Sequence, residues 1–135
     1  MSQENVDALR EGYEAFARGD LDGAFENFAD DIVWRSIGDS IPGGGTFNGI
    51  DEVRTRWLPE FAASYQDFSQ SVDQTLDCGD YVIALGTSSA TVGGQKVDES
   101  FCHVWRYSGD KIVEAIFFGD TAATYKALEA AKAAV

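Results

Sequence analysis

Basic side chains are scarce in this sequence. Its 135 residues include 10 Lys and Arg against 23 Asp and Glu, which gives a formal net charge of -13. Such a surface repels phosphate backbones and anionic lipid headgroups, so we expect neither a nucleic-acid partner nor a membrane partner. The charge is typical of a well-hydrated surface, with steering of a cationic ligand as the alternative.

Histidine and cysteine are also few. His103 is the only histidine, and the two cysteines, Cys78 and Cys102, lie far apart in the sequence. Zinc sites need three or four clustered ligands, so we expect no metal site, and in a reducing compartment the cysteines are expected to be free thiols. The run Pro42-Gly43-Gly44-Gly45 lacks the Gly-Lys-Ser/Thr of a phosphate loop, and no dinucleotide-binding or nucleophile-elbow motif is present. The sequence therefore predicts no cofactor.

Long apolar runs are absent as well. No stretch approaches the ~20 apolar residues that span a bilayer. Residues 1–5 lack the basic and apolar regions of a secretory signal, so a cytoplasmic protein is expected. With 44% hydrophobic and 13% aromatic residues, a chain of 135 residues can bury a core of its own. A single domain over residues 1–135 is the resulting expectation.

The order of the predicted elements favours an α+β fold. Apolar residues at helical spacing predict helices, and alternation with period two predicts strands. The helices are expected over 6–17, 21–28, 51–58 and 120–128, and the strands over 32–34, 68–76, 81–92, 97–107 and 111–118. Residues 36–49, with their glycine run, are expected to form a loop that serves as a mobile flap over a pocket, and Pro59 is expected to kink or end the third helix. Helices followed by hairpin-linked strands indicate α+β and not alternating βαβ units.

The strand over 97–107 is the most informative segment. One of its faces carries the only histidine among aromatic rings, in the order Val97, Glu99, Phe101, His103, Trp105 and Tyr107. An imidazole between Phe101 and Trp105 is expected to be desolvated, which favours its neutral form. That histidine then either acts in a pocket, as a hydrogen-bond donor or proton acceptor, or simply bonds a backbone carbonyl in the core.

Three other side chains are candidates for chemistry. Asp120 follows Phe117-Phe118-Gly119, so it is either a general base beside two rings, the N-cap of the last helix, or both. Arg35 either holds an enolate or carboxylate, or pairs with a neighbouring aspartate. Tyr13, on the apolar stripe of the first helix, either points its hydroxyl into a pocket or packs in the core.

Five short segments, in this order, resemble SnoaL-like proteins of the NTF2-like superfamily, which includes the ketosteroid isomerases. They are ARGDLDG at 17–23, FADDIVW at 28–34, GGTFNG at 44–49, HVWRY at 103–107 and GDTAA at 119–123. The resemblance covers nearly the whole chain. It implies a cone, in which a strongly curved mixed β-sheet, N-terminal helices and a C-terminal helix enclose a pocket. It also implies a homodimer through the outer sheet. The superfamily holds enzymes and binding proteins, so the fold alone does not fix the function.

The resemblance also suggests roles for individual residues. Tyr13 falls where steroid isomerases place their oxyanion-hole tyrosine. The general-base aspartate of those enzymes falls near Arg35 or Ser36 and their protonated aspartate near Cys102 or His103, which argues against steroid isomerase activity as such. The polyketide cyclases are similar to this chain at His103 and Asp120, where they place an acid/base aspartate near the end of the pocket.

We therefore predict a small-molecule pocket protein that removes a proton α to a carbonyl of an apolar substrate, as an isomerase or cyclase does. Asp120 is the expected base, His103 and Tyr13 are expected to stabilise the enolate oxygen, and Arg35 to assist. A non-catalytic ligand-binding protein of the same fold is the alternative, and a scaffold that uses its sheet as an interface is a third reading. The pocket wall is expected to contain Trp34, Trp57, Phe101, Trp105 and Phe118.

Overall fold

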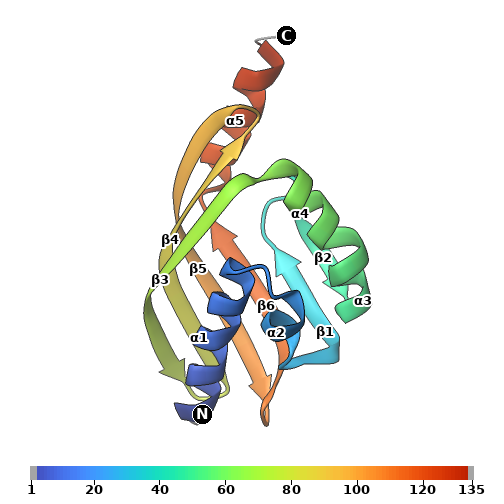
Figure 1. Cartoon of the computed structure of the whole chain (residues 1–135), viewed down its shortest axis with the longest axis vertical. Coiled ribbons are helices and arrows are strands. Elements are labelled where there is room, and N and C mark those ends of the chain that lie inside the picture. The colour runs from blue at the N-terminus through green and yellow to red at the C-terminus, as the bar shows by residue number, and fades with distance from the viewer. Residues whose placement is uncertain (1–2, 134–135) are drawn as a thin grey trace.

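A single curved six-stranded sheet organises the molecule. The computed structural model describes residues 3–133. The strand order is β2-β1-β6-β5-β4-β3, with β1 and β6 parallel and every other pair antiparallel, and the sheet does not close on itself (Figure 1). The strands are β1 (Phe28–Ser36), β2 (Gly45–Asn48), β3 (Gln66–Cys78), β4 (Tyr81–Val92), β5 (Gln95–Ser108) and β6 (Lys111–Gly119). The predicted mixed, curved sheet is confirmed.

Helices cover the concave side of this sheet and one end of it (Figure 1). Two residues of the first helix, Leu9 and Ala15, are buried in the main core. The last helix packs on the far end of the sheet, where Ala127 joins Ala90, Val92 and Val97 in a small second core. The helical segments are α1 (Gln3–Ala17), α2 (Leu21–Phe25), α3 (Ile50–Glu52), the π-helical turn η1 (Val53–Trp57), α4 (Leu58–Ser64) and α5 (Thr121–Ala133).

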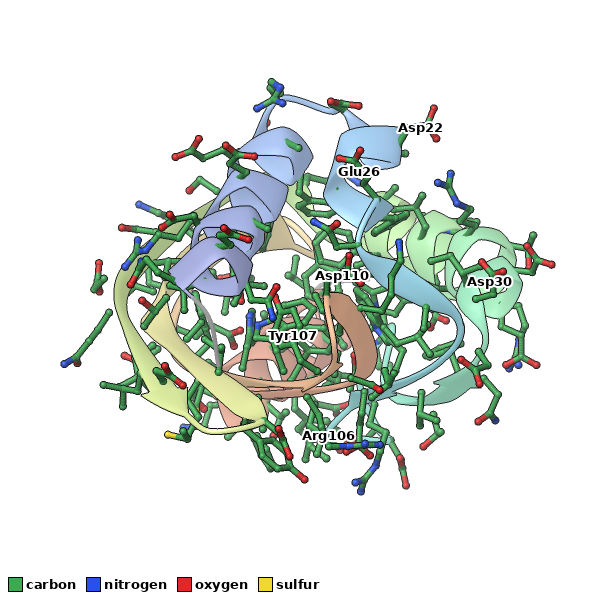
Figure 2. The ribbon with its side chains drawn as sticks, turned by 90° about the horizontal axis from the view of Figure 1, so that it is seen from below. Asp22, Glu26, Asp30, Arg106, Tyr107 and Asp110 are labelled. Atoms are coloured by element: carbon green, nitrogen blue, oxygen red, sulfur yellow. The ribbon has the colours of Figure 1, made fainter. Side chains whose placement is uncertain are left out.

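The faces of β5 alternate as its sequence predicts. Figure 2 shows the consecutive residues Arg106 and Tyr107 on opposite sides of the strand, with Tyr107 inside the cone. Tyr107 is 5% exposed and its neighbours Trp105 and Phe101 are equally buried, whereas Arg106 pairs with Glu114 on the outer face. Period-two alternation therefore delivers the aromatic set to the concave side.

One strand was not predicted. Residues 45–48 form β2, which pairs antiparallel with the edge of β1 and places Trp34 opposite Phe47. Phe47 is 4% exposed, so burial of this ring against β1 stabilises the segment despite the glycine run before it. The loop predicted over 36–49 is corrected to that extent.

The third helix also differs from its prediction. Of the two outcomes predicted at Pro59, an end near Leu58 is wrong. Helical structure continues to Ser64, with Pro59 in the first turn of α4. The π-helical turn η1 precedes this proline, at the point where the proline ring displaces the ordinary hydrogen-bond ladder. The second helix is likewise shorter than predicted, since α2 ends at Phe25 and Phe28 already belongs to β1.

Among residues 3–133, no helix is both long enough and apolar enough to cross a membrane.

Candidate functional site

An apolar cavity of about 200 Å³ lies between the concave face of the sheet and the helices α1, α2, η1 and α4. An enclosed apolar cavity of ~150 Å³ can hold a benzene molecule, so this one has room for a ring compound. Phe118 contributes to the wall, but it pairs with the outward-facing Cys102 and is 43% exposed, so it is in part a surface residue. The predicted wall residues that line the cavity are Trp34, Trp57, Phe101, Trp105 and Phe118.

The wall is a continuous set of aromatic contacts. The ring of Trp34 lies 4.4 Å from that of Phe117 and 4.7 Å from that of Trp57, measured between centroids. The imidazole of His103 lies 4.1 Å from the ring of Phe101 in a stacked arrangement, and 4.8 Å from Phe117 edge-on. These contacts hold His103 within a desolvated aromatic environment.

A short hydrogen-bond chain fixes that imidazole. The indole Nε1–H of Trp105 donates to Tyr13 Oη at 2.9 Å, and Tyr13 Oη lies 2.7 Å from His103 Nδ1. An indole nitrogen can only donate, so the tyrosine oxygen accepts from Trp105. Within residues 3–133, the one acceptor that bonds the hydroxyl proton of Tyr13 is then the Nδ1 lone pair, and leaving that proton unpaired would cost about 1–3 kcal/mol. Tyr13 and His103, two predicted site residues, are thus brought together.

This chain assigns the tautomer of His103. Nδ1 accepts from Tyr13, so the ring proton resides on Nε2. Nε2 bonds no group in the described chain and is not sealed from solvent, and His103 lines the cavity. Burial lowers the pKa of His103 to about 3, and burial also raises the pKa of Tyr13. At neutral pH the cavity therefore contains an uncharged imidazole whose Nε2–H is free to donate.

Tyr13 consequently differs from its predicted role. Its hydroxyl is occupied on both sides, by Trp105 and by His103, so it orients the imidazole and leaves no donor of its own for a ligand. Of these two residues, His103 is the one with a donor left for a ligand.

Arg35 does not line the cavity, which corrects its expected placement. Its neighbour Trp34 is buried on the inner face, so alternation along β1 places Arg35 on the outer face, beside Ile116 of β6. It is exposed, and it makes no ion pair with any carboxylate between residues 3 and 133, including the neighbouring aspartates.

Asp120 does not line the cavity either. It is exposed and directly precedes α5, where its Oδ1 accepts a hydrogen bond from the backbone N–H of Ala123 at 3.1 Å. This is the N-cap geometry expected of an aspartate at this position. The cap is therefore present in the structure, while the expected place of Asp120 among the pocket walls is corrected.

Glu99 is the carboxylate that does line the cavity. It lies on the inner face of β5, half-buried. Burial raises its pKa, and the nearby Asp120 carboxylate adds to that rise, whereas hydrogen bonds from Ser88 and from the Asp120 backbone oppose it. The Ser88 hydroxyl lies 3.4 Å from Glu99 Oε1. Period-two alternation alone placed this glutamate on the same face as Phe101 and His103, so the sequence carried a signal for it.

Two further features complete the wall. Trp34 Nε1 is buried without a hydrogen-bond partner within the described chain. Like His103 Nε2–H, this N–H, whose indole contacts Phe117, therefore has no acceptor. Pro42, Gly43 and Gly44 of the glycine run also line the cavity, and Tyr65 holds this run by donating its hydroxyl to the Pro42 carbonyl at 2.8 Å.

Metal-binding groups are not clustered in the part of the chain that the structure describes. No group of three or more His, Cys, Asp or Glu side chains there is arranged to hold an ion. Cys78 and Cys102 are both free thiols, the first exposed and the second partly buried.

Comparison with known families and structures shows the family to which the chain belongs and the solved structures that share its fold. The family model described as a SnoaL-like domain matches residues 9–115. A comparison with curated proteins gave no match. An NTF2-like protein of unknown function from Burkholderia pseudomallei K96243 is 31% identical, with a TM-score of 0.83 over 93% of this chain and 97% of that one.

Two other solved structures share the fold. An NTF2-like protein from Burkholderia thailandensis E264 is 26% identical, with a TM-score of 0.84 over 92% of this chain and 96% of that one. TerC, co-crystallised with polyporic acid, is 22% identical, with a TM-score of 0.84 over 93% and 98% of the two chains. At that identity the likeness to TerC shows the fold alone.

Proposed function

This chain belongs to the SnoaL-like domain family of NTF2-like proteins, and on that premise we propose that it binds an apolar small molecule in the cavity and holds a carbonyl oxygen of that molecule at His103. The observation that carries the proposal is the chain Trp105–Tyr13–His103, which leaves an uncharged Nε2–H free in an aromatic cavity. TerC, a protein of the same fold, was crystallised with a small molecule, which is in keeping with such a use of the fold.

A neutral donor in such surroundings favours a neutral or weakly charged acceptor. An imidazolium would attract an anion, whereas burial keeps His103 uncharged. The donor is also preoriented, because Tyr13 fixes the ring through Nδ1 and Phe101 stacks on it. A carbonyl oxygen that enters the cavity thus meets a donor whose orientation needs no further ordering.

The binding proposal is tested with 2-acetylnaphthalene and its near-isostere 2-isopropenylnaphthalene, in which a methylene replaces the carbonyl oxygen. Titration calorimetry on the wild type and on His103→Phe gives the ratio of ketone to alkene affinity for each protein. We expect that ratio to be about three- to tenfold higher for the wild type, as for one hydrogen bond. Equal ratios in the two proteins would rule out His103 as the carbonyl donor.

The reaction that such a donor would assist is isomerase- or cyclase-like removal of the proton α to the carbonyl. Donors aimed at an oxygen stabilise it most when it becomes an enolate. Asp120 would be the base, but its place outside the cavity wall favours the alternative, a ligand-binding protein without catalysis. Exchange of the methyl protons of 2-acetylnaphthalene in D2O, followed by NMR, separates the two. If the protein is a catalyst, it should accelerate the exchange, and Asp120→Asn should slow that exchange by ~10²-fold or more. If the exchange is no faster with the protein than in buffer, the protein binds the ketone without catalysis.

We propose, in addition, a homodimer through the outer face of the sheet. The register aligns Leu76, Ile83, Val104 and Ile116 in one row across β3, β4, β5 and β6. Leu76 is 38% exposed, and Tyr81 and Phe118 in the neighbouring rows are exposed as well. A contiguous apolar row on a sheet face is typical of a protein–protein interface.

The dimer is tested by sedimentation equilibrium at micromolar concentration. The wild type should show twice the monomer mass, and Ile116→Lys, which puts a charge in the apolar row, should shift it to the monomer mass. Ala62→Lys on the exposed side of α4 is the matched control and should not change the mass. A monomeric wild type would contradict the dimer.

A further inference from the structure

Glu99 lies in the same cavity as His103 but well apart from it. The two residues occupy the inner face of β5 four positions apart, with Phe101 between them. At ~3.3 Å per residue their Cα atoms are about 13 Å apart along the strand. Phe101 is the residue between them on this face, and its ring stacks on His103. The cavity thus has two polar points on one strand, joined by an aromatic surface.

The two points have opposite hydrogen-bonding character. His103 presents a donor, Nε2–H, whereas an ionised carboxylate can only accept. Glu99 accepts from the Ser88 hydroxyl, at a long 3.4 Å, and from the Asp120 backbone. The Asp120 carboxylate is the neighbouring like charge, and no Lys or Arg of the described chain pairs with Glu99. A carboxylate has about four acceptor positions. Glu99 therefore retains acceptor capacity toward the cavity that it lines.

From this arrangement we infer that the cavity recognises an elongated, apolar ring compound with an acceptor oxygen at one end, held by His103, and a hydrogen-bond donor such as a hydroxyl at the other, held by Glu99. The inference rests on the proposed binding of a carbonyl at His103 and adds the second end of the ligand. Glu99 is accordingly a recognition group. When the carbonyl is bound at His103, a proton on the carbon next to it lies close to His103 and far from Glu99, so Glu99 is not placed to remove it.

The matched probes are 2-acetylnaphthalene and its 6-hydroxy derivative, which adds one hydroxyl at the end opposite the carbonyl. Titration calorimetry at neutral pH measures the affinity of both for the wild type, Glu99→Gln, Glu99→Leu and His103→Phe. Circular dichroism verifies that each variant is folded, and Glu99→Gln, which is nearly isosteric, covers the case in which Glu99→Leu fails to fold.

We expect the wild type to bind the hydroxy ketone roughly tenfold more tightly than the parent ketone, as for a hydrogen bond to a charged group. Glu99→Gln should reduce that preference and Glu99→Leu should abolish it. His103→Phe should weaken both probes by a similar factor and keep the preference. Glu114→Gln, on the outer face, is the matched control and should leave all affinities unchanged.

The outcomes separate this inference from the proposed function. If the parent ketone binds in a His103-dependent manner but the hydroxyl adds nothing, or if its advantage persists in Glu99→Leu, the role of Glu99 is overturned while carbonyl binding stands. If neither probe binds the folded wild type, the ligand class fails and both proposals fall.

Discussion

At the scale of single residues, the direction of two hydrogen bonds, from Trp105 to Tyr13 and from Tyr13 to His103, determines which group of the cavity can bind a ligand. His103 has two ring nitrogens, and the sequence does not say which one carries the proton. The structure assigns it, because Trp105 can only donate and thereby directs the Tyr13 hydroxyl toward Nδ1. A residue that resembled an oxyanion-hole tyrosine thus becomes the support of a histidine donor.

Tyr13→Phe tests that support. Loss of the hydroxyl leaves Trp105 Nε1 and His103 Nδ1 without their partner in a buried place, so the free energy of unfolding should fall by roughly 2–4 kcal/mol. Urea denaturation measures the change. Tyr125→Phe is the matched control, because Tyr125 is 47% exposed, and it should cost little. Equal costs for the two variants would contradict the hydrogen-bond chain.

Asp120 allows a second test at this scale. Since its Oδ1 caps α5, Asp120→Ala should lower the free energy of unfolding by about 1 kcal/mol, whereas Asp120→Asn, which can still cap, should cost much less. Thermal or urea unfolding of the three proteins measures both effects. An alanine variant as stable as the wild type would show that the cap contributes nothing.

At the scale of elements, the sequence predicts the inward and outward faces of a strand well where its apolar residues alternate with a clear period of two. Alternation along β5 placed Phe101, His103 and Trp105 inside, and α5 begins where its cap predicted. The same rule, applied to β1, would have turned Arg35 outward beside an inward Trp34. Strand β2 was missed because four residues after a glycine run carry too little periodicity, and pairing with β1 is a long-range effect.

Replacing a glycine by alanine should change the free energy of unfolding in opposite directions in β4 and in α1. A Cβ on Gly86 in β4 would collide with the Ser71 carbonyl oxygen and with the Phe101 ring, so Gly86→Ala should destabilise by roughly 1–3 kcal/mol. A Cβ on Gly12 in α1 would meet only the Ala24 carbonyl at 3.5 Å, so Gly12→Ala should stabilise by about 0.5–1 kcal/mol. Urea unfolding of this pair measures both signs, and a destabilised Gly12→Ala would contradict the packing of α1 on α2.

At the scale of the whole molecule, the cavity is the product of a curved sheet that the N-terminal helices do not fill. Its wall is largely aromatic and aliphatic, and burial there lowers the pKa of His103 and raises that of Glu99. The positions of these two groups relative to each other come from the strand and could be predicted. The hydrogen-bond partners could not, because they come from α1 and β4, far away in the sequence.

The raised pKa of Glu99 makes stability depend on pH. Burial favours its protonated form, so its favourable contribution is complete below the unfolded-state pKa of about 4.3 and is lost as the pH rises through the higher folded-state value. Relative to the wild type, Glu99→Gln should therefore gain stability as the pH rises from about 4 toward 7. Urea unfolding across this range, with Glu11→Gln on the exposed face of α1 as a charge control, measures the trend. A stability difference that does not vary with pH would contradict it.

The central claim, that His103 presents an uncharged Nε2–H to the cavity, is tested most directly by NMR. His103 is the only histidine, so the two-bond ¹H–¹⁵N correlation spectrum of the labelled protein contains one imidazole. With its pKa lowered to about 3, that imidazole should show an unprotonated Nδ1 and a protonated Nε2, with no change from about pH 8 to pH 5. A proton on Nδ1, or a titration midpoint near the ordinary value of about 6.5, would contradict the account.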